Sequence, residues 1–294
     1  MDSDLLTDLT GKVFVVTGAN SGIGFEACRN FAKRGATLAM VCRDKTRGTI
    51  ALEQLKQETK NQQLQLFIAD FCSMENVVSV ARSLLSAYPS IDVLCNNAGS
   101  ANSDRVLTDD GFETTLAANH LSGFLLTQKL LPALLSDSGG SARVIFTSSL
   151  GHKNSPLDFD DLNLSNGYGT LKAYGRSKLM NLLTARTLDQ RYRHKGIIAS
   201  SFHPGAVRTE IWGKGGLLAK LLGIVMYPFM WNVEKGADTL IWLASSEEEG
   251  VLKAEGKYFF DRQNPTIAEF ATDDAADQLW SKSEELIANW LSVD

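Results

Sequence analysis

The sequence predicts an α/β protein built on one doubly wound, parallel sheet of seven strands with helices on both faces. Apolar runs of strand length alternate with amphipathic segments of helical length through most of the 294 residues, which is typical of a sheet covered by helices. The runs are apolar at successive positions, as in VFVVT at 13–17 and TLAMVC at 37–42, and this suits strands buried from both sides. No boundary interrupts the pattern, so we expect a single domain over residues 1–294.

The individual elements follow from the positions of these runs. The expected strands are Val13–Thr17, Thr37–Cys42, Leu64–Ala69, Val93–Asn96, Arg143–Thr147, Ile197–Phe202 and Lys257–Phe260. The expected helices are Gly22–Arg34, Lys45–Thr59, Met74–Tyr88, Asp109–Leu135, Lys172–Arg193 and Glu234–Ser245. Two irregular stretches, 152–170 and 210–232, break the alternation, and long insertions of this kind are more often functional than decorative.

Charge and cysteine content exclude several classes of function. The formal net charge is −5, from 29 Lys and Arg against 34 Asp and Glu. No global positive field is therefore available to gather phosphates, and nucleic acid is not an expected partner. The four cysteines form no CxxC pair and have no histidine at metal-ligand spacing. We interpret them as reduced, mostly buried side chains and expect no metal site.

The sequence indicates neither a leader peptide nor a membrane span. Residues 1–12 lack a basic region followed by an apolar run, so we expect no signal peptide. The most apolar stretch elsewhere, Leu221–Val233, is well short of the roughly 20 residues that cross a bilayer. We expect a cytoplasmic protein, and contact of this apolar stretch with a membrane surface stays open.

A glycine-rich turn, TGANSGIG at 17–24, joins the first expected strand to the first expected helix. Backbone N–H groups and the positive end of the helix dipole converge at such a turn and favour a bound phosphate. Gly18, Gly22 and Gly24 permit the tight turn, the close approach of a pyrophosphate and close packing of helix on strand. The spacing has one residue more than G-x-G-x-x-G, but the strand, turn and helix context is the required one. The turn predicts a dinucleotide cofactor.

The end of the second expected strand bears on which dinucleotide binds. An acidic residue there would hold a ribose 2′-hydroxyl and indicate NAD(H). The strand instead ends in Val41-Cys42-Arg43-Asp44, and the Arg43 guanidinium can pair with a 2′-phosphate while it stacks on adenine. This favours NADP(H). If the strand runs two residues further, Asp44 is the ribose ligand and Arg43 a solvated charge, so NAD(H) stays open.

Six motifs follow one another in a fixed order. They are TGANSGIG at 17–24, NNAG at 96–99, Asn119, TSS at 147–149, YGRSK at 174–178 and HPG at 203–205. The ordered set resembles the short-chain dehydrogenase/reductase family, with its Rossmann fold, over essentially the whole chain. Arg43-Asp44, Asn119-His120 and the long segment before Tyr174 are most similar to the retinol dehydrogenase and protochlorophyllide reductase branches. The resemblance implies hydride transfer between NADP(H) and a carbonyl or alcohol carbon.

The catalytic residues that the resemblance implies are Asn119, Ser149, Tyr174 and Lys178. Tyr174 and Lys178 lie four apart on an expected helix, hence on one face, and an ammonium near a phenol lowers the pKa of the phenol. By resemblance, Tyr174 is the general acid in reduction and the general base in oxidation. Ser149 polarises the substrate oxygen, with Ser148 as a backbone or capping residue, or with these two roles inverted. Asn119 holds a water next to Lys178, or is a buried amide satisfied by backbone.

The resemblance also assigns residues to the cofactor. Asp70 is expected to meet the adenine amino group, although capping of the following helix is nearly as plausible. Pro204 and Gly205 bend the chain under the nicotinamide, and Thr209 bonds its carboxamide. The full set is Gly18, Asn20, Ser21, Gly22, Ile23, Gly24, Arg43, Asp70, Phe71, Asn97, Ala98, Gly99, Tyr174, Lys178, Pro204, Gly205, Val207 and Thr209.

The segment 210–232 carries too much apolar surface to leave in water without a purpose. We expect a lid over the active site that accepts a lipophilic aldehyde, ketone or alcohol; a dimer surface and a membrane contact are the alternatives. Residues Pro156–Leu164 are expected to loop out over the substrate. The two long helices allow a homodimer, unless the C-terminal segment Asp273–Trp290 covers those faces or the pocket.

Two other functions stay open from the sequence. One is light-dependent reduction of a carbon–carbon double bond, as in protochlorophyllide reductase, which uses the same cofactor and the same tyrosine and lysine pair. The other is a non-catalytic NADP-binding redox sensor or scaffold. The presence of Asn119, Ser149, Tyr174 and Lys178 together speaks against the second, because a protein that only binds has little use for a proton relay.

Overall fold

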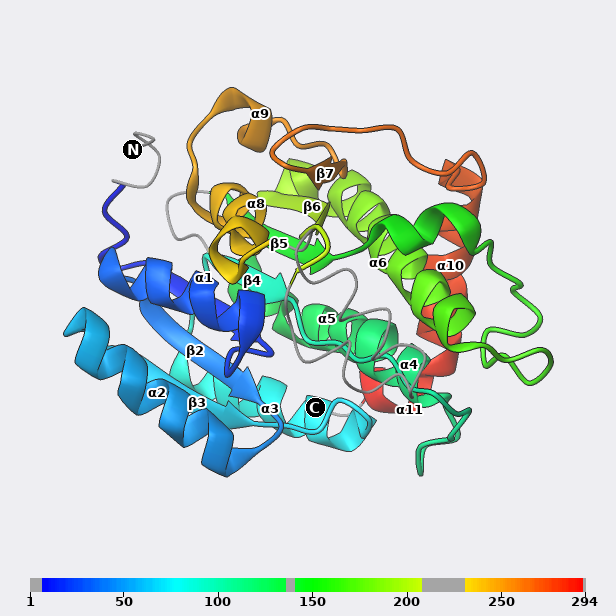
Figure 1. Ribbon diagram of the computed structural model, residues 1–294, viewed down its shortest axis with the longest axis horizontal. Coiled ribbons are helices and arrows are strands. Elements are labelled where there is room, and N and C mark those ends of the chain that lie inside the picture. Colours follow the sequence, from blue (N-terminus) through cyan, green and yellow to red (C-terminus); the bar gives the residue numbers. More distant parts are fainter. Residues whose placement is uncertain (1–6, 136–140, 208–230, 293–294) are drawn as a thin grey trace.

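The structure, a computed structural model, describes residues 7–135, 141–207 and 231–292. Seven strands form one sheet in the order β3-β2-β1-β4-β5-β6-β7 (Figure 1), and every neighbouring pair is parallel. The strands are β1 Val13–Thr17, β2 Thr37–Cys42, β3 Leu64–Ile68, β4 Val93–Asn96, β5 Ala142–Thr147, β6 Ile197–His203 and β7 Tyr258–Phe260. The predicted seven-stranded, doubly wound α/β fold is confirmed.

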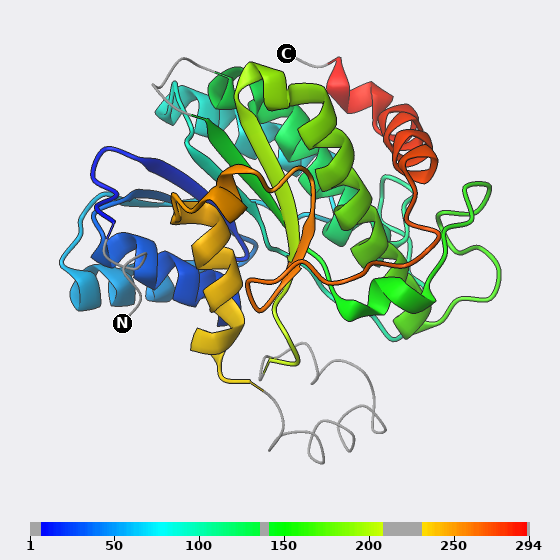
Figure 2. The same ribbon diagram turned by 90° about the horizontal axis from the view of Figure 1, so that it is seen from above.

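Helices cover the sheet on both faces (Figure 2). One face carries α1 Gly22–Lys33, α2 Lys45–Thr59, α8 Val233–Ser245 and α9 Glu249–Leu252. The other carries α3 Met74–Ala87, α4 Thr114–Leu116, α5 Ser122–Leu134, α6 Thr170–Tyr192, α10 Asp273–Leu286 and α11 Ala288–Leu291. The strand order reverses between β1 and β4, and open α/β sheets form a ligand crevice at such a point, beyond the carboxyl ends of the strands.

The helix expected at Asp109–Leu135 begins later than predicted, at Thr114. Leu107 and Glu113 form an isolated antiparallel bridge around a turn in which Gly111 has φ +83°. The Glu113 carboxylate then accepts hydrogen bonds from Thr115 N and Leu116 N, each at 2.8 Å. These bonds satisfy N–H groups that a helix start leaves without partners. The turn and the cap set the boundary, which the apolar spacing alone did not locate.

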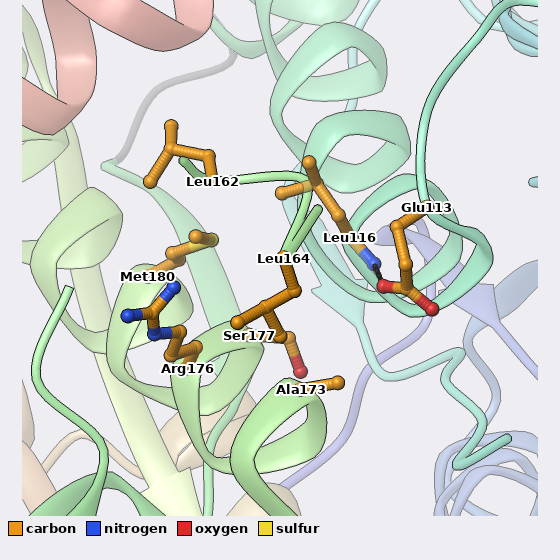
Figure 3. A pocket seen from close by; sticks show the side chains of 8 residues that line it. All are labelled: Glu113, Leu116, Leu162, Leu164, Ala173, Arg176, Ser177 and Met180. Atoms are coloured by element: carbon orange, nitrogen blue, oxygen red, sulfur yellow. Dashed lines mark hydrogen bonds between the residues drawn. The ribbon is translucent and has the colours of Figure 1, made fainter. Parts of the chain in front are cut away.

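The segment between Ser149 and Tyr174 loops out from the sheet, as the sequence predicts. Arg176 holds it against α6, because Nε donates to Pro156 O at 2.9 Å and Nη1 to Asp161 O at 3.1 Å. A cavity of about 10 Å³ remains between the loop, α4 and α6 (Figure 3), which is room for about one water molecule. These contacts place 156–164 beside α4 and α6, the helix that carries Tyr174, and its expected position over a substrate stays a prediction.

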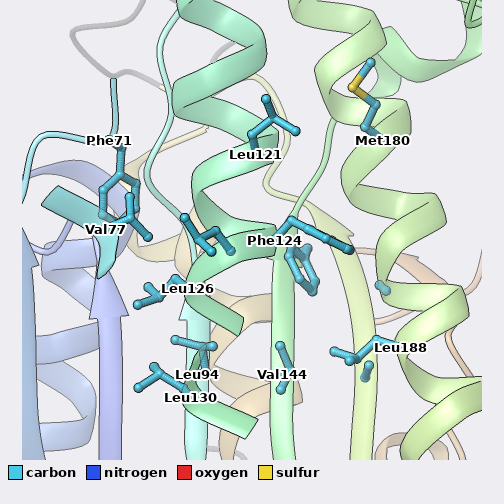
Figure 4. Close-up of a cluster of buried hydrophobic side chains, with 14 of the residues drawn as sticks. Phe71, Val77, Leu94, Leu121, Phe124, Leu126, Leu130, Val144, Met180 and Leu188 are labelled. Atoms are coloured by element: carbon cyan, nitrogen blue, oxygen red, sulfur yellow. The ribbon is translucent and has the colours of Figure 1, made fainter. Parts of the chain in front are cut away.

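The core on the α3, α5 and α6 face is apolar and closely packed (Figure 4). Phe124, Leu126 and Leu130 of α5 and Leu188 of α6 are almost completely buried against Leu94 and Val144 of the sheet. The strands that meet these side chains are buried on their other face as well, as the apolar runs predict. This packing fixes α6, which carries Tyr174 and Lys178, and α5, which follows the turn that carries Asn119.

The C-terminal helices cover the two long helices and not the crevice. Trp280 of α10 is buried with its ring edge-on to Phe124 at 4.9 Å. Ser283 Oγ lies 2.8 Å from His120 Nε2, and the Arg191 guanidinium stacks 4.6 Å from the Trp280 ring. Of the two places that the sequence left open for this segment, the structure shows the helix faces. The part of those faces under α10 is not available to a second copy of the chain.

Candidate active site

The glycine-rich turn lies where β1 passes into α1. Gly18 and Gly22 have φ of +67° and +55°, a backbone conformation that favours glycine. At Gly24 an added Cβ would stand 2.4 Å from Gly18 O and 2.6 Å from Asn97 Nδ2. The helix therefore packs against the turn and the end of β4 too closely for any side chain, as the prediction of close packing requires.

The N-terminus of α1 has the character of a phosphate site. Its first turn holds no acidic residue, and within the described part of the chain the Ser21 side chain makes no capping hydrogen bond. The first N–H groups of a helix have no partner inside the helix, and the dipole adds positive potential there. The residues present therefore fit the pyrophosphate of a dinucleotide.

The NNAG motif ties the ends of the central strands together. Asn97 N and Ala98 N both donate to Thr17 Oγ1 at 2.9 Å, and Asn97 Nδ2 donates to Thr17 O at 3.0 Å. A Cβ added at Gly99 would lie 3.2 Å from Asn119 Oδ1 and 3.4 Å from Lys178 Nζ. Gly99 is thus the point at which the cofactor turn and the predicted catalytic residues come together.

The end of β2 resolves one of the alternatives left open by the sequence. The strand ends at Cys42, and Asp44 is the N-cap of α2, where its carboxylate accepts from Arg47 N at 2.8 Å. The alternative in which the strand runs on and Asp44 binds a ribose is therefore not supported. Arg43 is exposed and makes no hydrogen bond or ion pair with the described residues, so its guanidinium is free to meet an anion.

Asp70 does not cap the next helix. The N-cap of α3 is Ser73, whose hydroxyl accepts from Asn76 N at 3.3 Å. One Asp70 oxygen accepts from Cys72 N at 3.0 Å, which leaves the other carboxylate oxygen for a donor such as an adenine amino group. Burial and the Asp70 charge raise the pKa of Cys72 to about 11, while Arg43 acts in the opposite direction. Arg43 and Asp70 thus both lie near Cys72, beyond the carboxyl ends of β2 and β3.

The remaining predicted cofactor residues follow the same edge. Asn20 and Ser21 lie in the glycine-rich turn, Ile23 in the first turn of α1, Phe71 after β3, and Pro204, Gly205 and Val207 after β6. The Trp231 ring packs on Gly205, where an added Cβ would stand 2.5 Å from Trp231 Cε3. Thr209 and nearly all of the expected lid lie outside the described residues, so both stay predictions.

Ser149, Tyr174, Lys178 and Asn119 come together although they are far apart in sequence. Lys178 Nζ lies 5.3 Å from the centre of the Tyr174 ring, one turn along α6. The Ser149 hydroxyl lies near enough to the Tyr174 hydroxyl to act on the pKa of Tyr174, which it lowers. Lys178 is buried and Tyr174 half-buried, and Asn119 Oδ1 and Lys178 Nζ both face Gly99. The long segment between Ser149 and Tyr174 has displaced neither residue, as predicted.

Burial dominates the ionisation of Tyr174 and Lys178. It raises the pKa of the Tyr174 hydroxyl, and the Ser149 hydroxyl opposes that rise only in part. It lowers the pKa of Lys178 to about 8. Loss of solvent disfavours the charged form of both groups. In the chain without cofactor the effect of burial on the Tyr174 pKa is thus the larger one, and the predicted lowering by the ammonium together with an oxidised nicotinamide stays a prediction.

Lys178 keeps donors for a ligand. Within the described ranges Nζ donates to Thr147 O at 3.0 Å, a carbonyl that also accepts from Asn181 Nδ2 at 3.0 Å. An ammonium has three N–H donors, so two remain. A buried cation with unused donors fits the ribose hydroxyls of a dinucleotide.

The two serines after β5 have different surroundings. Ser148 is completely buried, and its hydroxyl donates to Lys178 O at 2.7 Å. Ser149 is half-buried, accepts from Gly151 N at 3.2 Å, and reaches Tyr174. The contacts agree with the assignment of Ser149 to the substrate and of Ser148 to the backbone.

Asn119 lies in a π-helical turn, Ala117–Leu121, between α4 and α5, and such turns are frequent at functional sites. Its Nδ2 donates to Ser100 O at 2.9 Å and to Ser177 Oγ at 3.0 Å, and its Oδ1 accepts from Ser100 N at 2.7 Å. The side chain is thus bonded at both ends, which matches the interpretation as a buried amide satisfied by the chain. It holds the loop after Gly99 against α6.

Sequence reasoning assigned no site role to three residues that lie beside this cluster. His152, His203 and Tyr258 are buried, and each has a polar atom without a hydrogen-bond partner in the part of the chain that the structure describes. His152 Nδ1 lies 2.6 Å from Ser149 O. The available signal was the spacing, since His152 follows Ser149 by three residues, one turn of a 3₁₀ helix.

Neither a metal centre nor a membrane span is found in the described ranges. They contain no group of three or more His, Cys, Asp or Glu side chains placed to hold a metal ion. None of their helices is long and apolar enough to cross a bilayer.

Comparison with known proteins identifies the family. A family model described as short chain dehydrogenase matches residues 12–216. The chain belongs to the short-chain dehydrogenase/reductase family. It is thus an NAD(P)-dependent oxidoreductase that acts on CH–OH and C=O groups.

This short-chain dehydrogenase/reductase is similar to one curated relative and two solved structures in particular. Retinol dehydrogenase 12 of Mus musculus is 37% identical over 280 residues, which cover 95% of this chain and 87% of that protein. A crystal structure of a protein from Mycobacterium paratuberculosis, 30% identical, matches with a TM-score of 0.76 and covers 96% of both chains. The RhlG/NADP complex of Pseudomonas aeruginosa, 22% identical, matches the fold with a TM-score of 0.68 over 92% of this chain and 100% of that one.

Gly99→Ala should weaken cofactor binding, because the new Cβ would press on Asn119 Oδ1 and Lys178 Nζ. We expect the Kd for NADPH, measured by fluorescence titration, to rise about tenfold, or about 1.4 kcal/mol. Gly169→Ala is the matched control, since its Cβ would meet nothing nearer than Lys172 Cβ at 4.0 Å. Equal affinities in the two variants would contradict the position of the groove.

Buried histidines make the stability of this enzyme depend on pH. Burial lowers the pKa of His120 to about 3 and that of His203 to about 4. The unfolded chain protonates these rings below their ordinary pKa of about 6.5, whereas the folded chain keeps them neutral. The unfolded state therefore binds more protons, so the free energy of unfolding falls as the pH drops from about 6.5 towards 4.

At pH 5 each of these two rings should have lowered the free energy of unfolding by up to about 2 kcal/mol relative to pH 7. Urea denaturation between the two pH values measures the loss. His120→Asn removes one titrating ring, so its stability should decline less steeply with falling pH, even though the variant starts less stable. Identical slopes for variant and wild type would show that folding does not lower the pKa of His120.

Proposed function

We propose that this chain is an NADP(H)-dependent oxidoreductase that transfers hydride between the nicotinamide and the carbonyl or alcohol carbon of a lipophilic aldehyde, ketone or alcohol. One observation carries the proposal. A half-buried tyrosine, Tyr174, lies beside the Ser149 hydroxyl and one helical turn from the buried ammonium of Lys178. The three side chains lie at the carboxyl edge of the sheet, where Lys178 faces Gly99 of the NNAG motif.

Each residue has a defined task in carbonyl reduction. The Ser149 hydroxyl donates to the substrate oxygen, where negative charge builds up as hydride reaches the carbon. The Tyr174 hydroxyl gives its proton to the same oxygen, and it takes the proton back in alcohol oxidation. When bound, the cofactor supplies or accepts the hydride, and its oxidised ring carries a positive charge that favours the phenolate.

Lys178 binds the cofactor and orients it. Its two free N–H donors are placed to hold ribose hydroxyls, and its charge lies 5.3 Å from the Tyr174 ring. Asn119 acts indirectly, because its amide holds Ser100 and Ser177 in place near Lys178. The pKa of Lys178, lowered to about 8 by burial, leaves it mostly protonated at neutral pH.

Tyr174→Phe should lower kcat by about 10²-fold to 10⁴-fold, the usual worth of a positioned proton donor, while NADPH still binds. The assay follows NADPH absorbance with a panel of lipophilic and small polar aldehydes and ketones. Tyr192→Phe, at the far end of the same helix, is the matched control and should keep wild-type turnover. An undiminished kcat in Tyr174→Phe would overturn the proposed chemistry and would favour a protein that only binds the cofactor.

The choice of NADP(H) over NAD(H) rests on Arg43. This side chain is exposed, makes no bond with any described residue, and shares its corner of the edge with Asp70. Asp44, the residue that would favour NAD(H), lies beyond the end of β2, where one of its carboxylate oxygens caps α2. The complex of RhlG with NADP, a protein of the same fold, is in line with this choice.

Arg43→Ala should raise the KM for NADPH at least tenfold, because it removes a charge-assisted bond to the 2′-phosphate. The KM for NADH should change little, since NADH lacks that group. Lys33→Ala is the control for charge alone, because Lys33 is exposed at the opposite end of α1. Better turnover with NADH than with NADPH in the wild type, or equal loss for both cofactors in Arg43→Ala, would contradict the assignment.

The lipophilic substrate class is supported by the rim of the site and by the relatives. Leu150, next to Ser149, is 46% exposed, and Leu171, three residues before Tyr174, is 82% exposed. Exposed aliphatic side chains beside a reacting centre favour an apolar substrate. Retinol dehydrogenase 12 is named for such an alcohol, which makes retinal a suitable first member of the panel. No advantage of lipophilic over small polar carbonyls would remove this part of the proposal.

A further inference from the structure

We propose that His152 is a positioning residue for the reaction: its neutral ring holds the Ser149 backbone in the place from which the Ser149 hydroxyl reaches Tyr174. The proposal rests on the proposed function, in which Ser149 acts on the substrate oxygen. Nothing in the motifs that identify the family includes His152. The inference comes from its contacts alone.

His152 belongs to a short 3₁₀ helix, Leu150–Asn154, that begins directly after Ser149. The Ser149 carbonyl accepts two hydrogen bonds from this one residue, from its backbone N at 3.2 Å and from its ring Nδ1 at 2.6 Å. A carbonyl oxygen can only accept, so Nδ1 carries the proton. The hydrogen bond therefore fixes the tautomer of the ring.

The hydrogen bond to Ser149 O is the one polar contact of the His152 ring among the described residues. His152 is 0% exposed, and its Nε2 has no hydrogen-bond partner within residues 7–135, 141–207 and 231–292. The Tyr258 ring packs edge-on against it, with the ring centres 4.8 Å apart. Burying an imidazole is costly unless its polar atoms are bonded. An apolar side chain would fill this space at less cost, so the bond to Ser149 O is the one polar gain that explains a histidine at this position.

The hydrogen bond from His152 Nδ1 to Ser149 O helps to set the position of Ser149 relative to Tyr174. The same short helix presents Gly151 N to Ser149 Oγ at 3.2 Å. Gly151 in turn faces α6, where an added Cβ would lie 3.4 Å from Gly175 Cα and 3.8 Å from Tyr174 Cδ1. His152 thus fixes the Ser149 carbonyl by a hydrogen bond. The short helix that contains His152 packs, through Gly151, against α6 at Tyr174 and Gly175. Reacting groups tolerate displacements of only about 0.5 Å before rate is lost.

Two substitutions separate positioning from bulk. His152→Asn keeps an N–H donor at the position of Nδ1, whereas His152→Gln places its donor one bond further out, at the position of Nε2. We expect His152→Asn to keep kcat within about threefold of wild type and His152→Gln to lose at least tenfold, because small misplacements are costly to catalysis. The Kd for NADPH should be unchanged in both. If the two variants lose kcat equally, or in proportion to their loss of thermal stability, the proposal is wrong.

A double-mutant cycle with Ser149→Ala covers the case in which His152→Gln folds poorly. If His152 acts through Ser149, adding His152→Gln or His152→Leu to Ser149→Ala should not reduce the residual kcat further, whereas independent effects would multiply. Additive losses would overturn the inference. Wild-type activity in Ser149→Ala would instead overturn the proposed function itself. An inactive Ser149→Ala with a fully active His152→Gln would remove only the positioning role of His152.

Discussion

The site depends on one constraint: the carboxyl ends of parallel strands meet at a single edge of the sheet. The hydrogen bonds from Asn97 and Ala98 to Thr17 fasten β4 to β1 at the point where the strand order reverses. From there the glycine-rich turn leads to one face, and α5 and α6 cover the other. Residues from several segments far apart in sequence therefore lie at one edge of the sheet without any long-range ion pair between them in the described part of the chain.

Burial sets the ionisation of the two titratable groups at this edge, Tyr174 and Lys178. Loss of solvent raises the pKa of Tyr174 and lowers that of Lys178, so the chain alone holds both groups nearer to neutrality than water would. Lys178 moreover keeps donors unused. In the proposed function a bound dinucleotide would offer ribose hydroxyls to those donors and, when oxidised, a positive charge to the phenol. Cofactor binding and proton transfer are in this way two consequences of the same desolvation.

The fold could be read from the sequence closely, and the site only in part. Strands buried on both faces give continuous apolar runs, so β1, β2 and β4 have the predicted bounds. The start of the helix at Thr114 was missed because the Glu113 cap and the turn at Gly111 are local features that apolar spacing does not encode. The pKa of Tyr174 and the contact of His152 with Ser149 were out of reach, since both depend on which atoms are buried together.

Direct observation of the hydride would test the central claim. NADPH labelled with deuterium at the transferable position of C4 is incubated with the enzyme and a lipophilic aldehyde, and the alcohol is analysed by mass spectrometry and NMR. The account predicts one deuterium on the former carbonyl carbon of the product. Alcohol that carries hydrogen from the solvent at that carbon, or consumption of NADPH without labelled alcohol, would contradict it.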